Sequence, residues 1–249
     1  IRTIREMAGV DENGGRTRGR LQKLDLSNTN ILAGSDYYLI DKGNKLTIKT
    51  DNTLPDKLFY GCSMEEISFP SAGIHNFGKG VWAYCNKLSH VSLTPAADAN
   101  FKVDGNMIYN TDKTTLMAVT PLVREDINIP DGVKTIDDYA LAGCSMVRKI
   151  AIGNDVKNIG REAFGYCWSM EELKVRPKDI PQLGTDVFAA ANTQTCKLTV
   201  RAGSKARYAS LAQWKEFTNI VEFGVTVKAR NLSRIYGDDN PELTYTVIG

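Results

Sequence analysis

The sequence contains two histidines, His75 and His90, and a Ser-His-Asp or Cys-His catalytic site would have to use one of them. No G-x-S-x-G turn, which presents the nucleophilic serine of many hydrolases, accompanies either histidine. His90 lies two residues before Ser92, at a position that we expect to point outward from a short strand. We therefore interpret His90 as a solvated surface residue and expect neither catalysis nor metal binding from the histidines.

Four cysteines recur at one spacing, because Cys62 to Cys85 is 85 − 62 = 23 residues and Cys144 to Cys167 is 167 − 144 = 23 residues. Stacked cysteines at this spacing could form disulfides or hold a metal. Against both, the total of five cysteines is odd and no C-x-x-C pair occurs. The Cβ atoms of stacked coils also run parallel rather than toward each other. We predict five free thiols, Cys196 included, that act as small buried apolar groups.

Two further motifs could carry chemistry. Residues 73–79, GIHNFGK, match the G-x4-G-K pattern of a phosphate-binding loop, but Gly80 stands where that loop requires Ser or Thr. The carboxylate pairs at 65–66 and 171–172 could perform glycosidase chemistry across a cleft. Both pairs occupy the same position of a repeat, however, which indicates a solvated scaffold. The sequence thus predicts no cofactor, no metal and no enzymatic activity.

Composition narrows the class of protein. The 249 residues are 42% hydrophobic and 24% charged, as in ordinary globular chains. With 31 basic and 29 acidic residues, the formal net charge of +2 gives no reason to expect a nucleic-acid partner or an anionic membrane surface. No apolar run approaches the ~18 residues of a membrane-spanning helix. The chain opens at Ile1 without Met or an apolar leader, and we expect that a secretory signal has been removed.

The residues that follow each cysteine form a repeat. A few polar residues come first, and then a short run in which apolar residues alternate. Alternation at period two predicts a strand with one buried face, and the 23-residue period lies within the ~20–29 residues of leucine-rich repeats. Stacked strands of this kind form a parallel sheet. The apolar members are Ile67 and Phe69, Val91 and Leu93, Ile150 and Ile152, Leu173 and Val175, and, after Cys196, Leu198 and Val200.

A second apolar set predicts buried residues on another side of each coil. It pairs Val133 with Ile136 and Val156 with Ile159. An aromatic residue before each cysteine is expected to fill the interior of the coil. One coil cannot bury a core alone, so we expect stability to come from contacts between neighbouring coils. The predicted interior aromatics are Phe59, Trp82 and Phe164.

The period breaks between Cys85 and Cys144, which are 144 − 85 = 59 residues apart. Residues 100–121 contain two alternating segments with a D-G turn and an N-T-D turn. This pattern predicts a β-hairpin inserted in the stack of coils. The hairpin also offers a candidate binding surface, formed by Met107, Tyr109 and Met117.

The repeats resemble a known family. Residues 129–152, IPDGVKTIDDYALAGCSMVRKIAI, and residues 156–175, VKNIGREAFGYCWSMEELKV, resemble the BspA-like leucine-rich repeats, and so does the segment predicted as a hairpin. Residues 4–31 look like that family's N-terminal cap, and residues 198–220 look like its terminal cap. The resemblance covers roughly residues 4–223. One departure is that Gly153 follows Ile152, where the family more often has proline after the strand, which leaves the expected fold unchanged.

Beyond Phe223 the sequence no longer follows the repeat pattern. Residues 225–249 resemble the start of an MBG-type repeat, a β-rich module of large bacterial surface proteins, with Tyr236–Pro241 as the core string. Only 249 − 224 = 25 residues remain after Gly224, and a module below ~40 residues seldom folds alone. We expect the module to continue past Gly249, the alternative being that this tail docks onto the solenoid. The pair Asp238-Asp239 invites a calcium interpretation, but the Asn-Pro that follows is an ordinary turn signal.

We therefore predict a β-rich (α/β) solenoid, a right-handed leucine-rich-repeat coil with parallel strands, an inserted β-hairpin and a short β tail. The predicted N-terminal cap covers residues 1–45 and the solenoid residues 46–223. Within the solenoid we place the hairpin at about 100–121 and the terminal cap at about 197–223. Residues 224–249 form the truncated MBG-like tail.

The outward positions of the predicted strands are the candidate ligand-binding residues. They are expected to line up on one sheet as an extended surface of the kind that repeat proteins use for binding. None of them is Trp, Tyr or Arg, the types that dominate interface energetics. The outward residues are Glu66, Ser68, His90, Ser92, Lys149, Glu172, Lys174, Lys197 and Thr199.

The resemblance implies a secreted or cell-surface bacterial protein that binds protein or glycan ligands, some of them host-derived, and performs no catalysis. We expect a monomer with no nucleic-acid partner and no membrane-spanning segment. Two alternatives stay open. One is a rigid spacer within a larger surface protein, and the other is a hydrolase of a surface polymer, which would need a cleft with perturbed acid and base groups.

Overall fold

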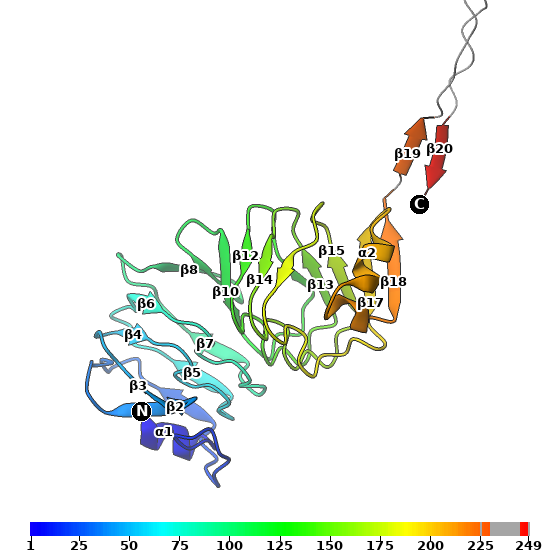
Figure 1. Ribbon diagram of the computed structural model, residues 1–249. Coiled ribbons are helices and arrows are strands. Elements are labelled where there is room, and N and C mark those ends of the chain that lie inside the picture. The colour runs from blue at the N-terminus through cyan, green and yellow to red at the C-terminus, as the bar shows by residue number, and fades with distance from the viewer. Residues whose placement is uncertain (225, 230–244, 249) are drawn as a thin grey trace, which may run out of the picture.

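Short alternating segments of the repeat fold into the strands of a solenoid, seen in Figure 1 as a stack of coils. The structure is a computed structural model that describes residues 1–224, 226–229 and 245–248. The predicted solenoid of parallel strands is confirmed. Each strand is only two to five residues long, and it ends where the coil must turn toward the next side.

The strands that follow the cysteines form two parallel sheets rather than the single predicted one. No pairing joins β7 to β11, because the insertion between them separates the two halves of the stack. The first sheet contains β1 (Lys23–Asp25), β5 (Glu66–Ser68) and β7 (His90–Ser92). The second contains β11 (Ile127–Asn128), β13 (Lys149–Ile152), β15 (Glu172–Val175), β17 (Lys197–Arg201) and β18 (Asn219–Phe223).

The second side of the coils is also built from strands. Its apolar residues include Val133, Ile136, Val156 and Ile159, which are all buried as predicted. In the first half β4 (Thr53–Leu54) pairs with β6 (Asn76–Phe77). In the second half the order is β16 (Gln182–Leu183), β14 (Asn158–Ile159), β12 (Thr135–Ile136), β10 (Thr115–Val119), β9 (Met107–Asn110) and β8 (Phe101–Asp104).

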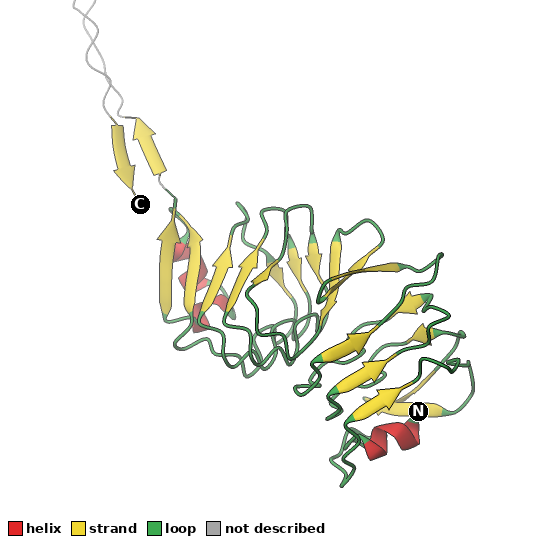
Figure 2. Ribbon diagram, turned by 180° about the vertical axis from the view of Figure 1, so that it is seen from behind, coloured by secondary structure: helices red, strands yellow, loops and turns green. Residues whose placement is uncertain are grey.

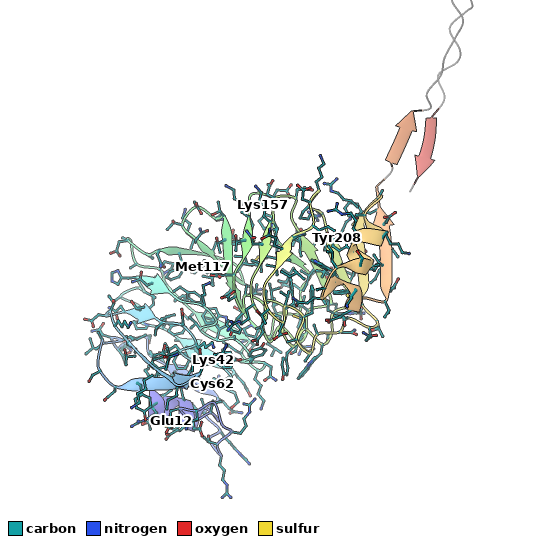
Figure 3. All side chains as sticks on the ribbon, viewed as in Figure 1. Glu12, Lys42, Cys62, Met117, Lys157 and Tyr208 are labelled. Atoms are coloured by element: carbon teal, nitrogen blue, oxygen red, sulfur yellow. The ribbon has the colours of Figure 1, made fainter. Side chains whose placement is uncertain are left out.

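The insertion contains three antiparallel strands instead of the two of a single hairpin. β8, β9 and β10 are joined by the two predicted turns, and β10 then pairs in parallel with β12. The insertion therefore extends the sheet of the second side. Tyr109 is buried and Met107 and Met117, the latter labelled in Figure 3, are partly buried against the cores. Tyr109 therefore cannot contribute to the predicted binding surface, whereas a contribution from the partly buried Met107 and Met117 stays a prediction.

The insertion divides the interior into two apolar cores, one in each half. The strands of the two halves run in different directions (Figures 1 and 2). The turns that precede the cysteines, however, remain hydrogen-bonded to each other across the junction of the two halves. Tyr84 N there donates to Ala142 O at 3.0 Å. Trp82 Nε1 donates to Val119 O at 3.1 Å across the same junction.

Caps close both ends of the described solenoid. At the N-terminal end, α1 (Arg2–Met7) places the buried Arg5 against the first coil, where its guanidinium donates to Leu58 O at 2.9 Å. Beside it, β2 (Tyr37–Asp41) and β3 (Asn44–Thr47) form a hairpin.

At the other end, α2 (Lys205–Ser210) and the 3-10 turn η1 (Trp214–Glu216) cover the last coil. The predicted cap residues Tyr208 (labelled in Figure 3), Trp214 and Phe217 are buried there.

The tail contributes two described strands, β19 (Thr226–Ala229) and β20 (Tyr245–Ile248), which pair antiparallel. The string Tyr236–Pro241 that resembles an MBG repeat, with its Asp238-Asp239 pair, lies outside the described residues.

All five cysteines lie in the described part of the chain, and all are buried and free of disulfides. The prediction of free thiols is confirmed. Cys85 Sγ donates to Phe59 O at 2.9 Å, so the thiol satisfies a carbonyl of the preceding coil. Burial raises the pKa of Cys62 to about 11 and that of Cys167 to about 12.

Phe164 is fully buried and stacks on Phe188 of the next coil, with ring centroids 5.6 Å apart. We predict that Phe164→Ala lowers the free energy of unfolding by about 3–5 kcal/mol, since it leaves a large cavity. Urea denaturation measures this cost. As a control, Trp168→Ala removes a half-exposed ring and should cost less than about 1 kcal/mol. A cost below that value for Phe164→Ala would show that its ring is not part of the core.

The buried thiols also predict loss of stability at alkaline pH. Unfolded thiols ionise near their ordinary pKa of about 8.5, whereas folded Cys62 and Cys167 stay protonated until about pH 11 and 12. Their contribution is therefore complete below about pH 8.5 and is lost as the pH rises through the folded pKa, at up to about 1.4 kcal/mol per pH unit for each thiol. Denaturation under reducing conditions across this range tests it. Cys167→Ala should show a shallower decline, and an unchanged slope would refute the assignment.

Candidate binding surface

The predicted row of outward residues does not form one continuous surface. Its members are divided between the two sheets, with Glu66, Ser68, His90 and Ser92 on β5 and β7 and the remainder on β13, β15 and β17. Because the halves run in different directions, the two groups do not share a plane.

Within each group the polar side chains bind one another. Lys197 Nζ lies 3.0 Å from Glu172 Oε1, and Lys23 Nζ lies 2.9 Å from Glu66 Oε1. Lys174 Nζ sits over the Phe223 ring at 4.7 Å, whereas Lys149 is exposed. These contacts pair several of the charges along the sheet, and the role of this surface in binding stays a prediction.

Thr199 was expected on this surface, and that expectation is wrong. Only 7% of the residue is exposed, and its hydroxyl donates to Glu172 Oε1 at 2.8 Å. The adjacent strand β18, which the repeat pattern does not mark, covers this position because it pairs with β17.

The histidines lie apart from each other. His75 Nδ1 is 2.5 Å from Asp98 Oδ1 at an exposed site, and the exposed His90 contacts the hydroxyl of its neighbour Ser89 at 2.9 Å. Among the described residues, no group of three or more His, Cys, Asp or Glu side chains could hold a metal ion. In the same part of the chain, no helix is both long enough and apolar enough to cross a bilayer.

A row of aromatic side chains lies on the turn side instead, where the backbone is continuous between the halves. Tyr60 and Tyr84 meet edge to face with centroids 5.1 Å apart, and Tyr84 and Tyr166 do so at 5.0 Å. Trp168 extends the row, 5.3 Å from Tyr166. Tyr166 and Trp168 are 42% and 51% exposed. We call Tyr60, Tyr84, Tyr166 and Trp168 the aromatic row.

The backbone that holds this row is unusual. The residue directly before each of the four recurring cysteines has a left-handed conformation, with φ of 75° at Gly61, 61° at Tyr84, 90° at Gly143 and 60° at Tyr166. Glycine adopts this region freely, but for other residues it costs about 1–2 kcal/mol. Two of these four coils therefore have a tyrosine at the position where the other two have glycine, which this turn favours. Left-handed non-glycine residues also occur at other positions of the coils, as at Lys57 and Tyr139.

Glycines in the second half make room for Tyr84. A Cβ at Gly143 would lie 2.9 Å from the Tyr84 Cα, and a Cβ at Gly165 would collide with the Tyr84 hydroxyl. The missing side chains let the ring of Tyr84 cross from the first half onto the second.

The Tyr84 hydroxyl then donates to the Glu162 carboxylate. Burial raises the pKa of Tyr84 well above its usual range, and the hydrogen bond and negative charge of Glu162 raise it further. The phenol therefore stays protonated at neutral pH and holds the carboxylate in one place.

A lysine supports the row from the inside. Lys57 Nζ lies 5.4 Å from the Tyr60 ring centroid and 5.1 Å from that of the buried Tyr139. The same ammonium pairs with Asp41 at 2.9 Å. These contacts fix Tyr60 and already occupy its cation-binding face.

The aromatic row borders a cavity of about 300 Å³ at the junction of the two halves. Its walls come from residues before the insertion and from residues after it. The two charged side chains at the cavity have opposite signs, Arg16 and Glu162, and Arg16 Nη1 donates to Gly61 O at 2.9 Å. Beside the aromatic row, the polar lining residues are Arg16, Asn86, Ser145 and Glu162.

The model of the BspA type leucine rich repeat region matches residues 21–120 and 123–210 of this chain, in six copies. The chain belongs to the BspA-type leucine-rich-repeat family. A search of curated proteins found no match.

Three solved structures are similar to this chain, and the first of them shares its fold. A leucine-rich repeat protein from Eubacterium ventriosum is 22% identical with a TM-score of 0.51, over 61% of this chain and 40% of that one. A leucine rich cell surface protein from Faecalibacterium prausnitzii is 17% identical with a TM-score of 0.48, over 82% and 60%. A leucine-rich repeat protein from Bacteroides ovatus is 16% identical with a TM-score of 0.38, over 81% and 52%. The chain thus spans about half the length of these proteins.

The aromatic row could have been found in the sequence by comparing equivalent positions of the repeats. Tyr84 and Tyr166 occupy the same position of their coils, directly before the cysteine, where glycine stands in the coils of Cys62 and Cys144. We predicted an interior position for Phe59, Trp82 and Phe164 and made no prediction for the tyrosines directly before the cysteines. Departures from the glycine of the repeat mark the residues that face outward.

The left-handed backbone predicts an inverted order of stability at Tyr166. Because φ is 60° there, Tyr166→Gly should be more stable than Tyr166→Ala by about 1 kcal/mol. At the half-exposed Leu211, where φ is −84°, the alanine variant should instead be the more stable of the pair. Thermal or urea unfolding of the four variants compares them. The same order at both sites would mean that Tyr166 is not strained.

Proposed function

We propose that this BspA-type chain is a binding or adhesion module of a bacterial surface protein that recognises a protein or glycan ligand and performs no catalysis. The observation that carries the proposal is the aromatic row, with Tyr166 and Trp168 exposed beside a cavity. Exposed apolar patches on soluble proteins often mark sites of interaction. Tyr, Trp and Arg are also the residues that dominate binding energy at interfaces.

Support for a location at the cell surface comes from membership of the BspA-type family, whose resemblance implies secretion and display. The caps at both ends of the stack and the rigid coils between them support a module that acts as one unit and as a monomer. The tail after Gly224 is proposed as the start of a further β module.

The aromatic row favours binding over the role of a rigid spacer. A spacer needs only stacked coils. Glycine before each cysteine would form the left-handed turn with less strain than Tyr84 and Tyr166 do. A hydrolase would need paired acid and base groups. In the cavity, Glu162 is the one carboxylate of the lining residues, and Tyr84 already holds it.

The test is to apply the labelled chain to arrays of extracellular-matrix proteins and of mammalian and bacterial glycans. We expect retention of at least one ligand, reduced by more than tenfold in affinity by the double variant Tyr166→Ala, Trp168→Ala. The matched control is Lys149→Ala on the outward strand face, which should bind as the unaltered chain does.

Each alternative has its own outcome on the same arrays. Retention of nothing above the level of a heat-unfolded sample would favour the spacer. Release of soluble products from a polymer, lost on Glu162→Gln, would favour the hydrolase. Loss of binding with Lys149→Ala alone would return the site to the strand surface.

A further inference from the structure

We infer that the cavity at the junction binds the pyranose ring of an uncharged glycan, stacked on Trp168 and hydrogen-bonded to Glu162 and Arg16. This inference rests on the proposed binding function and names the ligand class and its site. It follows from the way in which exposed aromatic faces and hydrogen-bonding groups of both kinds meet at one cavity.

The apolar part of the site is a pair of exposed rings. Trp168 and Tyr166 lie 5.3 Å apart with their planes tilted by 48°, and each leaves about half of its surface open to solvent. A pyranose presents an apolar face of C–H groups that covers one aromatic ring. Burial of that face removes apolar surface from water on both partners, and the tilt of the second ring closes one side of the space.

The polar part offers both donors and acceptors. Glu162 can accept about four hydrogen bonds, and Arg16 carries five N–H donors. Tyr84 is the partner of Glu162 in the structure, and Gly61 O is that of Arg16, so each retains capacity. Sugar hydroxyls donate and accept at once, and they therefore match a wall that contains a carboxylate, a guanidinium and the Asn86 amide.

Charge and geometry argue against the other ligands that aromatic cavities bind. Lys57 already occupies one face of Tyr60, and Arg16 offsets the attraction that Glu162 would exert on a cationic ligand. A proline-rich peptide offers carbonyl acceptors but few N–H donors, so it would not use the acceptor capacity that Glu162 retains beside its bond from Tyr84. One acidic and one basic wall residue give the cavity no net charge, which suits an uncharged ligand.

The site is prepared before the ligand arrives. Tyr84 is fixed by its bond to Glu162 and by contact with Tyr166, in a space that Gly143 and Gly165 leave open. Fewer groups therefore lose freedom on binding, which reduces the entropic cost of association.

Trp168 reports on the site directly. The chain has three tryptophans, and Trp82 and Trp214 are 2% and 1% exposed against 51% for Trp168. Acrylamide quenching of the tryptophan fluorescence of the full chain therefore reports mainly on Trp168. The probes are cellobiose, maltose, lactose and chitobiose at millimolar concentration, with a proline-rich peptide in parallel. We expect at least one disaccharide to protect Trp168 from quenching.

Variants then locate the site by isothermal titration calorimetry with the disaccharide that protects. We expect Trp168→Ala to weaken binding by more than tenfold. Glu162→Gln should weaken it less, since the amide oxygen still accepts from Tyr84. Leu211→Ala, which alters a half-exposed apolar residue in the terminal cap, should leave binding unchanged, and circular dichroism confirms that each variant is folded.

Protection by none of the four disaccharides overturns the inference, and so does protection by the peptide alone. Binding that survives Trp168→Ala overturns the location. These failures are distinct from failure of the proposed function: a chain that binds an array ligand independently of Trp168 remains a binding module, whereas a chain that retains nothing on the arrays is not one.

Discussion

The whole structure depends on hydrogen bonds between one coil and the next. A single coil contributes only one strand to each sheet, so its backbone N–H and C=O groups must form hydrogen bonds with the neighbouring coils. On the turn side Phe59 N donates to Val81 O at 2.7 Å and Gly61 N to Ala83 O at 2.9 Å, and the same pattern recurs through the stack. Apolar burial follows the same rule, because Phe164 packs on Phe188 of the adjacent coil. The caps are required for the same reason, since an end coil without a neighbour exposes its core and its backbone polar groups; in the last coil Val187 N donates to Gln213 Oε1 of the cap.

This dependence explains which features the sequence predicts well. The solenoid, the free thiols and the buried aromatics follow from residues that repeat, because a repeated position has a repeated environment. Phe59, Trp82 and Phe164 are buried as their place before the cysteine indicates. The resemblance to the BspA-like repeats rests on the same residues and is confirmed.

The features that the sequence predicts less well all involve contacts between unlike segments. The insertion was expected as one hairpin, and its third strand β10 joins β12 through a pairing that no periodicity marks. The break between β7 and β11 follows from that insertion. Thr199 is covered by β18, whose residues belong to the cap. The aromatic row escaped prediction for a related reason: whether a tyrosine before cysteine points inward or outward depends on the left-handed backbone at that position, which is a property of the turn.

The position of the cavity at the junction has an evolutionary consequence. Its two walls belong to segments before and after the insertion, and the cores of the halves are separate. Substitutions that repack one core would leave the opposite wall in place. A change in the length or pairing of the insertion, by contrast, would rotate one wall against the other without altering any residue that touches a ligand. Selection could thereby adjust ligand preference among descendants of this chain through a segment that never meets the ligand.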